Sequence, residues 1–135
     1  PKADPQWKTS IRRGAYVAKD CEGAPDVVIV ATGSEVSVAL QTAAALTDRK
    51  VRVVSMLSRA LFDAQPMDWQ RSLVPAAAKK VIFEAGVSFG WKGIADDSTL
   101  VVGIDRFGES GPYQKIAEHL GITAASLEKR IRAGK

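Results

Sequence analysis

The strand-to-helix junction at residues 26–40 constrains the fold of this chain more than any other segment. It begins with a run of β-branched apolar residues, Val27–Val30. A short polar turn, Thr32–Glu35, follows, and a helical pattern of apolar residues then begins without a linker. A strand that passes directly into a helix is the opening unit of an α/β fold, in which the first helix amides lie at the carboxyl end of the strand.

The polar turn also carries a helix-start signal. Thr32 and Glu35 fit the Ser/Thr-x-x-Glu capping box, in which the Thr32 hydroxyl accepts from the Glu35 amide and the Glu35 carboxylate reaches back to the Thr32 amide. Apolar residues then recur at helical spacing, at Val36, Ala39, Leu40, Ala43 and Leu46. We therefore predict a helix that turns this face toward the core.

Further strands and helices alternate along the rest of the chain. Apolar runs of strand length occur at residues 14–18, 51–56, 80–85 and 99–104. Helical patterns occur at residues 67–74 and 113–120, a last helix starts at Thr123, and residues 57–66 are irregular. Strands separated by helices predict parallel pairing with right-handed crossovers. We predict an α/β fold of three layers, with about five strands in a mixed, mostly parallel sheet and one antiparallel edge strand.

The beginning of the chain sets the expected domain boundaries. Residues 1–13 are polar and contain two prolines, so we predict a linker or arm that Trp7 docks, followed by one domain at residues 14–135. The strand at residues 14–18 is separated from the next strand by residues rich in turn formers. This spacing suits a β-hairpin, so we predict that the first strand pairs antiparallel with the second, at an edge.

Composition and charge exclude several classes of protein. The chain has 135 residues, 46% of them hydrophobic and 25% charged, which is typical of one globular domain. Its apolar runs are much shorter than the roughly 20 residues of a spanning helix, so we expect no membrane partner. The net charge is +4, and the cations at residues 129–135 have no interleaved aromatic residues. They suit a helix end better than a nucleic-acid surface, so we expect no nucleic-acid partner.

His119 and Cys21 are the sole residues of their kinds and are weak candidates for chemistry. No cluster of His and Cys accompanies His119 to complete a metal site, so a surface histidine near a helix end is favoured. Cys21 lies in a turn without a second functional group, which argues against a nucleophile. A single cysteine cannot form an internal disulfide, which agrees with a reducing compartment, and we expect a cytoplasmic location.

The turn after the strand at residues 27–31 is the first candidate site. Thr32, Gly33 and Ser34 could bind an anion through the first helix amides and the helix dipole. No Gly-x-Gly-x-x-Gly loop and no Walker motif accompanies them, and a plain helix start is the favoured interpretation.

A second group of candidates lies in two later loops, at residues 86–93 and 105–112. Its residues are Phe89, Trp91, Phe107, Gly108, Glu109 and Ser110. The first loop places two aromatic rings among glycines, which fits either an interface or burial beneath the domain's own loops. The second follows a strand and fits either a ligand-binding loop or a turn that lets the backbone pack closely.

Five segments, in this order and spacing, resemble the carboxyl-terminal domain of transketolase. They are Arg13–Val17, Ile29–Val36, Val51–Met56, Val81–Gly86 and Phe107–Pro112. The resemblance covers nearly the whole chain from about Ile11 onward. The combination is specific, whereas each segment alone is a weak signal. The loop after Gly86 departs from the commoner family pattern, which has more aromatic residues there.

The resemblance implies both an activity and a place for this domain in it. Transketolases use thiamine diphosphate and a divalent metal, Mg²⁺ or Ca²⁺, to move two-carbon ketol units between ketose and aldose phosphates in the pentose phosphate pathway. They are homodimers of three-domain subunits, and the cofactor lies between the first two domains. The resemblance implies that the third domain binds no cofactor or metal and supplies no catalytic residue.

The same resemblance implies the partners of the chain. They are the remaining transketolase domains and a second subunit of the homodimer. The third domain is expected to organise the dimer, and a regulatory site has been suggested there. The isolated chain is therefore expected to be inactive, although its full-length parent is a transferase.

Two alternatives stay open on the sequence alone. The chain could be a stand-alone anion- or nucleotide-binding module that uses Thr32–Ser34, with residues 107–111 as a second element. It could also be the equivalent domain of a ketoacid dehydrogenase β subunit, in which such a domain likewise serves assembly.

Overall fold

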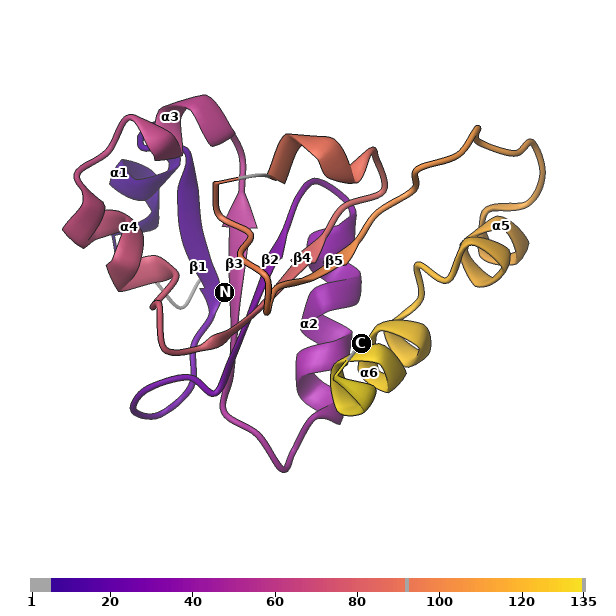
Figure 1. Cartoon of the computed structure of the whole chain (residues 1–135), viewed down its shortest axis with the longest axis horizontal. Coiled ribbons are helices and arrows are strands. Elements are labelled where there is room, and N and C mark those ends of the chain that lie inside the picture. Colours follow the sequence, from indigo (N-terminus) through magenta and orange to yellow (C-terminus); the bar gives the residue numbers. More distant parts are fainter. Residues whose placement is uncertain (1–5, 92, 135) are drawn as a thin grey trace.

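A five-stranded mixed sheet forms the centre of the molecule in the computed structural model, which describes residues 6–91 and 93–134 (Figure 1). The strands are β1 (Ala15–Lys19), β2 (Val27–Ala31), β3 (Val51–Met56), β4 (Lys79–Phe83) and β5 (Leu100–Val102). They lie in the order β1-β3-β2-β4-β5, and every neighbouring pair is parallel except β1 and β3. The predicted α/β fold, with five mostly parallel strands and one antiparallel edge, is confirmed.

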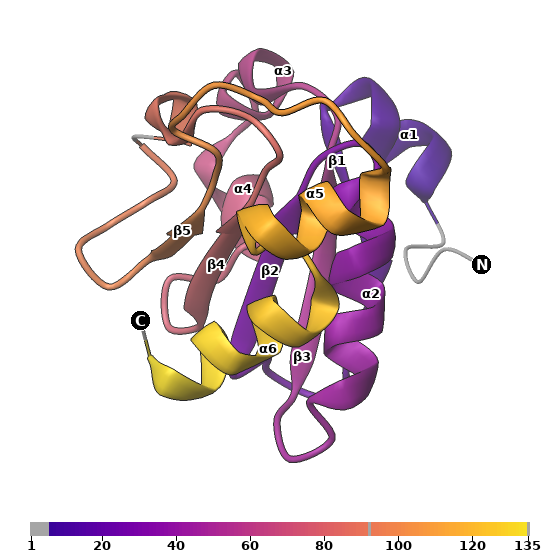
Figure 2. The same cartoon turned by 90° about the vertical axis from the view of Figure 1, so that its right-hand side faces the viewer.

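Helices cover both faces of this sheet and give the predicted three layers. They are α1 (Trp7–Arg12), α2 (Glu35–Ala45), α3 (Arg59–Asp63), α4 (Met67–Leu73), the 3₁₀ helix η1 (Ser88–Trp91), α5 (Tyr113–Leu120) and α6 (Ala124–Ala133). Residues of α2, α5 and α6 pack on one face, and residues of α3, α4 and η1 on the other (Figures 1 and 2). Within the described part of the chain, no helix is long and apolar enough to cross a membrane.

β2 is the central strand and is buried along its whole length. Val27 and Ile29 point into the core on the α2 side, whereas Val28 and Val30 point into the core on the α4 side. A strand covered on both faces has no solvent side, which explains why this run is continuously apolar rather than alternating. The face predicted for the following helix is also confirmed, because its apolar residues lie in or against the core on the α2 side.

β1 does not form a hairpin with β2, so that prediction was wrong. It pairs antiparallel with β3, with Ala15 opposite Met56, and it is the edge strand. The place beside β2 is taken by β3 because the unit β2–α2–β3 is a parallel crossover. Asp26 holds the two strand starts together, since its carboxylate accepts from the Lys50 amide at 2.9 Å. The turn formers signal a chain reversal, but they do not specify which strand is the neighbour.

Gly14 fixes the entry of the chain into β1. Its φ is +95°, in a region that side chains strongly disfavour, and a Cβ here would lie 2.4 Å from the Ser58 carbonyl oxygen. The Gly14 carbonyl accepts from the amides of Leu57 and Ser58, at 2.8 and 3.0 Å. The beginning of β1 is therefore bonded directly to the segment that leaves the carboxyl end of β3.

Two segments that the sequence analysis left without helices contain one each. Residues 57–66, predicted to be irregular, include α3, whose first turn is capped by the Ser58 hydroxyl accepting from the Leu61 amide at 3.3 Å. The arm predicted at residues 1–13 includes α1, and the rest of that prediction, at residues 1–5, lies outside the described residues. Both helices are short, so the periodicity that reveals a longer helix is missing.

The two last helices follow their sequence signals closely. α5 ends at Gly121, which has a φ of +71°, and Thr123 caps α6 by accepting from the Ser126 amide at 3.3 Å. α5 begins directly after Pro112 and covers the predicted residues 113–120.

Candidate functional site

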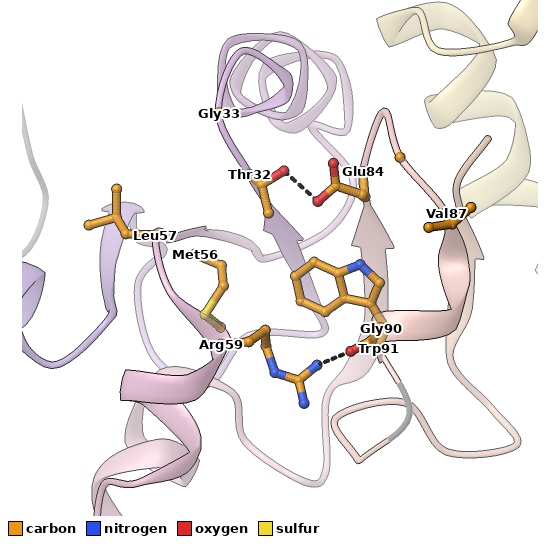
Figure 3. Close-up of a pocket in the computed structure, with 10 residues that line it drawn as sticks. Thr32, Gly33, Met56, Leu57, Arg59, Glu84, Val87, Gly90 and Trp91 are labelled. Atoms are coloured by element: carbon orange, nitrogen blue, oxygen red, sulfur yellow. Dashed lines mark hydrogen bonds between the residues drawn. The ribbon is translucent and has the colours of Figure 1, made fainter. Parts of the chain in front are cut away.

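A cleft of about 680 Å³ opens where β2, β3 and β4 end (Figure 3). Because these strands are parallel, each delivers its next residues to the same edge of the sheet. The lining includes Thr32, Met56, Leu57, Glu84, Val87 and Trp91. Its side chains are mostly apolar, with a few polar groups at one end, which is the usual make-up of a binding cleft.

Thr32 and Glu84 form the polar end of the cleft. The Thr32 hydroxyl donates to Glu84 Oε2 at 2.7 Å, across the two neighbouring strands that precede them (Figure 3). The predicted capping box does not form, because the residue before α2 is Ser34 and its side chain makes no capping hydrogen bond. The sequence prediction was wrong here because the Glu35 amide donates to the Thr32 carbonyl instead, and the Thr32 hydroxyl turns to the Glu84 carboxylate that follows the next strand.

Thr32 and Gly33 of the predicted anion site line this cleft, Ser34 follows them, and two carboxylates lie beside this turn. Glu84 accepts from Thr32, and Glu35 accepts from the Ser34 hydroxyl at 2.7 Å. The Glu35 amide is itself engaged, because it donates to the Thr32 carbonyl at 3.0 Å. Two negative groups beside the helix start repel an anion, and each counteracts the favourable helix dipole.

Arg59 forms the opposite wall. Its guanidinium lies 5.3 Å from the centre of the Trp91 ring and donates to the Gly90 carbonyl at 3.0 Å (Figure 3). The same group pairs with Asp63, one turn further along α3, at 3.0 Å. Stacking and bidentate pairing are the two interactions for which a guanidinium is best suited. Arg59 thus fastens η1 to α3 and has its charge compensated within the domain.

The two aromatic candidates of the loop at 86–93 have opposite environments. Trp91 is 4% exposed and belongs to the core on the α4 side, whereas Phe89 is 73% exposed. One turn of 3₁₀ helix therefore turns one ring inward as an anchor and holds the other outward. Trp69, by contrast, packs from α4 against Phe62, with ring centres 5.7 Å apart, and anchors its helix.

The loop at 105–112 is joined to the loop at 86–93 at its first residue. Asp105 accepts from the Ser88 amide at 2.8 Å and from the Ser88 hydroxyl at 2.7 Å. These two donors hold the pKa of Asp105 below its usual value, the amide having the larger effect. The Ile104 amide also donates to the Gly86 carbonyl at 2.8 Å. The beginning of the second loop is therefore fixed to the first loop.

The predicted ligand residues of this second loop do not line the cleft. Phe107 is 97% exposed, and Gly108 and Ser110 are also exposed. Glu109 Oε1 lies 3.2 Å from His119 Nε2 on α5, so the sequence's single histidine is a surface residue paired with a carboxylate. The structure thus separates the candidates into a cleft at the ends of β2–β4 and an exposed loop.

Two residues that complete the cleft, Glu84 and Arg59, were not predicted. Glu84 follows β4 directly, as Thr32 follows β2, and the rule that parallel strands end at one edge would have paired them. Arg59 belongs to α3, which the sequence analysis did not predict. No local signal identifies it as a cleft residue, because its partners in the cleft, Gly90 and Trp91, are 31 and 32 residues away along the chain.

The sheet order and the carboxyl-edge cleft define a class of α/β domain in which four parallel strands carry one antiparallel edge strand. A model of the family described as the transketolase-like TK C-terminal domain matches residues 14–123. The chain belongs to this family. The resemblance drawn from the sequence to the carboxyl-terminal domain of transketolase is therefore confirmed.

Individual relatives agree with the family match. The chain is 39% identical over 131 residues to the chromosomal transketolase of Cupriavidus necator, covering 96% of this chain and 19% of that protein. The structure of transketolase from Leishmania mexicana superposes with a TM-score of 0.86 at 38% identity, covering 98% of this chain and 19% of the other. A structure described as a split gene transketolase, inactive beta4 tetramer, matches at 26% identity with a TM-score of 0.67, over 91% of this chain and 42% of the other.

These coverages show that the chain spans about a fifth of the transketolases that it matches. The family implies thiamine diphosphate and a divalent metal, so we tested whether the described residues fit them. No group of three or more His, Cys, Asp or Glu residues in residues 6–91 and 93–134 is placed to hold a metal ion. The cleft offers one carboxylate, Glu84, which repels a diphosphate, and one cation, Arg59, which is already paired with Asp63. The described residues do not fit the cofactor.

Proposed function

We propose that this chain is the supporting carboxyl-terminal domain of a transketolase that transfers two-carbon ketol units from ketose phosphates to aldose phosphates. The parent enzyme uses thiamine diphosphate with Mg²⁺ or Ca²⁺, which its preceding domains hold. It acts as a homodimer in the cytoplasm, in the pentose phosphate pathway. This domain organises the assembly and contributes no reacting group.

One observation carries the proposal. The match to transketolases extends over nearly the entire chain, yet accounts for only 19% of the length of the Cupriavidus necator relative. A match of this kind is what a domain of a larger enzyme gives, and the family is described as a C-terminal domain. The cofactor, the metal and the sugar phosphates then belong to the remaining four-fifths of such an enzyme.

The pairing of the polar side chains among the described residues favours a structural role for this domain. The strongest polar groups at the cleft are already paired within the domain, Thr32 with Glu84 and Arg59 with Asp63. A general acid or base needs a positioned partner and access to a reacting atom, and these pairs instead brace neighbouring strands and helices. The relative described as an inactive split gene transketolase tetramer is a precedent for a polypeptide with this domain that is inactive in that assembly.

The two alternatives have less support. A stand-alone anion module is disfavoured because Glu84 and Glu35 lie beside the proposed anion site. A ketoacid dehydrogenase domain is disfavoured because the relatives reported above carry the name transketolase.

Ketol transfer by the complete enzyme tests the proposal. The complete enzyme to which this chain belongs would be purified. It would be assayed with a ketose phosphate donor and an aldose phosphate acceptor, in the presence of thiamine diphosphate and Mg²⁺. We expect turnover by the complete enzyme and none by the 135-residue chain under the same conditions. Turnover by the chain alone, or a parent without ketol transfer, would contradict the proposal.

A further inference from the structure

A second cavity, of about 240 Å³, lies on the α4 side of the sheet. It shares no lining residue with the cleft at the carboxyl edge. Phe62, Val74 and Ile94 form the apolar part of its lining, and all three belong to or pack against the core on this side. Pockets for drug-sized ligands measure about 300–1,000 Å³, so this cavity suits a smaller molecule.

Lys80 brings a buried positive charge to this cavity. It is the second residue of β4 and lies on the same face of the strand as Ile82, with 9% of its surface exposed. Its ammonium donates to Asp96 Oδ2, which is its one partner among residues 6–91 and 93–134. Because an ammonium has three donors, two donors of this buried group remain for an acceptor from outside the chain.

Asp96 also lines the cavity but is held by other donors. Its Oδ1 accepts from the Ser98 amide at 3.0 Å and from the hydroxyls of Ser98 and Thr99 at 2.7 and 2.9 Å. Lys80 and these donors keep the pKa of Asp96 well below its ordinary value, with Lys80 having the largest effect. Asp96 is therefore a fixed anion whose second oxygen turns to residues 98–99 and leaves the other donors of Lys80 unused.

Arg71 adds a second cation to the same cavity. It belongs to the last turn of α4, and its guanidinium has no partner in the described part of the chain. The cations of Arg71 and Lys80 outnumber the single anion of Asp96, so the cavity favours a ligand with one negative charge. A guanidinium and an ammonium both form strong, charge-assisted hydrogen bonds with a carboxylate. The apolar lining beside them favours a carboxylate that carries an apolar body over a bare inorganic ion.

We propose that this cavity is a binding site for a small monocarboxylate with an apolar body. The ligand carboxylate accepts from Lys80 and Arg71, and its apolar part covers Phe62, Val74 and Ile94. The site requires no step of ketol transfer and lies outside the carboxyl-edge cleft.

Nuclear magnetic resonance titration of the 135-residue chain with benzoate tests the site. We expect saturable shifts of the amide signals of residues 94–96, with a dissociation constant of about millimolar or lower. Amides of residues 126–130 on α6, which packs on the other face of the sheet, should not shift. This control also detects general attraction of anions, because Lys129 and Arg130 are exposed there. The absence of saturable shifts at 94–96 would overturn the inference.

Two further ligands separate the contributions of charge and of apolar contact. Benzamide has nearly the shape of benzoate without its charge, and acetate has the charge without the ring. Each should bind at least about tenfold more weakly than benzoate. Equal binding of benzamide would overturn the role of the cations, and equal binding of acetate would reduce the site to one for any small anion.

A matched pair of arginine variants tests the site in the folded protein. Arg71→Gln should weaken benzoate binding at least about threefold, whereas Arg130→Gln, at an exposed arginine of α6, should leave it unchanged. Lys80→Met removes the buried ammonium and keeps a side chain of similar length, and it should abolish saturable binding. Urea unfolding shows whether this variant is folded; if it is not, the arginine pair decides. Equal effects of the two arginine variants, or binding that survives in folded Lys80→Met, would overturn the inference.

Calorimetric titration of the complete enzyme with benzoate shows whether the cavity stays accessible there. We expect the same dissociation constant as for the 135-residue chain, within about threefold, and its loss in Lys80→Met. A complete enzyme that does not bind benzoate would contradict a site that serves the enzyme.

Discussion

The two edges of the sheet are built from different interactions. At the amino ends of the parallel strands, charged groups hold the loops, with Asp20 on Arg52, Asp26 on the Lys50 amide and Lys80 on Asp96. At the carboxyl ends, glycines and aromatic residues form the loops, and the exposed side chains include large apolar ones, Leu57, Leu61, Val87 and Phe89, beside charged ones such as Asp63 and Glu109.

This difference bears on two tasks of a domain, maintenance of its fold and contact with other protein. Charged loops are well solvated when exposed, and exposed ion pairs contribute little to stability. Exposed apolar side chains contribute favourable free energy only when they are removed from water. The amino edge is therefore held by charged pairs, whereas the carboxyl edge exposes more apolar surface.

Truncating the buried anchor of the carboxyl edge should have the largest effect. Trp91→Ala should lower the free energy of unfolding by about 3–5 kcal/mol, because a buried ring and its stacking with Arg59 are lost. Phe89→Ala, at the exposed neighbour in the same 3₁₀ helix, should change it by less than about 0.5 kcal/mol. Urea unfolding of the isolated chain measures both variants. Similar losses of stability would show that the buried and the exposed ring do not differ in what they contribute to the fold.

Gly14→Ala should have the next largest effect. Its positive φ and the 2.4 Å approach of a Cβ to the Ser58 carbonyl predict a loss of roughly 1–3 kcal/mol. Gly108→Ala is the control, since a Cβ there meets no atom within 4 Å, and it should alter stability by less than about 0.5 kcal/mol. Thermal unfolding of the pair checks the prediction, and a stable Gly14→Ala protein would show that β1 is not fixed at this point.

The fold could be predicted from the sequence wherever a segment had a strong period or cap of its own. The continuous apolar run of β2 requires cover on both faces, and Gly121 ends α5 as its type suggests. The partner of β1 could not be predicted, because strand order depends on contacts between segments far apart in the sequence. The same reason explains why the capping box at Thr32 does not form, since the Thr32 hydroxyl donates to Glu84, 52 residues away along the chain.

The sequence indicated where a cleft would lie, whereas binding of an anion there stays a prediction. Thr32 and Gly33 do lie in a cleft at the carboxyl edge, as an α/β unit suggests. Glu84 and Arg59, which give the cleft its charge, come from segments that no local pattern joins to it. The opposite environments of Phe89 and Trp91 depend on one turn of 3₁₀ helix, and composition alone could not assign which ring is buried.

A smaller effect is expected from the polar bond across the cleft. Thr32→Val removes the hydroxyl that donates to Glu84 and should reduce stability by about 1 kcal/mol. Thr32→Ser keeps the donor and should retain most of that stability. Chemical denaturation of the two variants distinguishes the bond from the loss of packing. Equal destabilisation by Val and Ser would show that the hydroxyl contributes nothing.

The smallest effect concerns an ion pair at the amino edge. The Lys80 ammonium, helped by the hydroxyls of Ser98 and Thr99, holds the pKa of Asp96 well below its ordinary value of 3.8. A lowered folded-state pKa gives stability that is present above the unfolded value and is lost as pH falls through the folded value. Between about pH 5 and about pH 2, the native chain should therefore lose more stability than Asp96→Asn.

The control for this ion pair is Asp97→Asn, at the exposed neighbouring carboxylate. It should leave the acid sensitivity of the native chain unchanged, as urea midpoints at the two pH values would show. Identical pH dependence in all three proteins would mean that Lys80 and Asp96 do not hold this edge together in solution.

Calorimetric titration of the isolated chain with thiamine diphosphate and Mg²⁺ tests most directly the claim that this domain supports chemistry located elsewhere. The account predicts no binding heat up to about millimolar cofactor, because the cation of the cleft, Arg59, is already paired with Asp63 and its carboxylate, Glu84, repels a diphosphate. A saturable heat with a dissociation constant of about micromolar would contradict it.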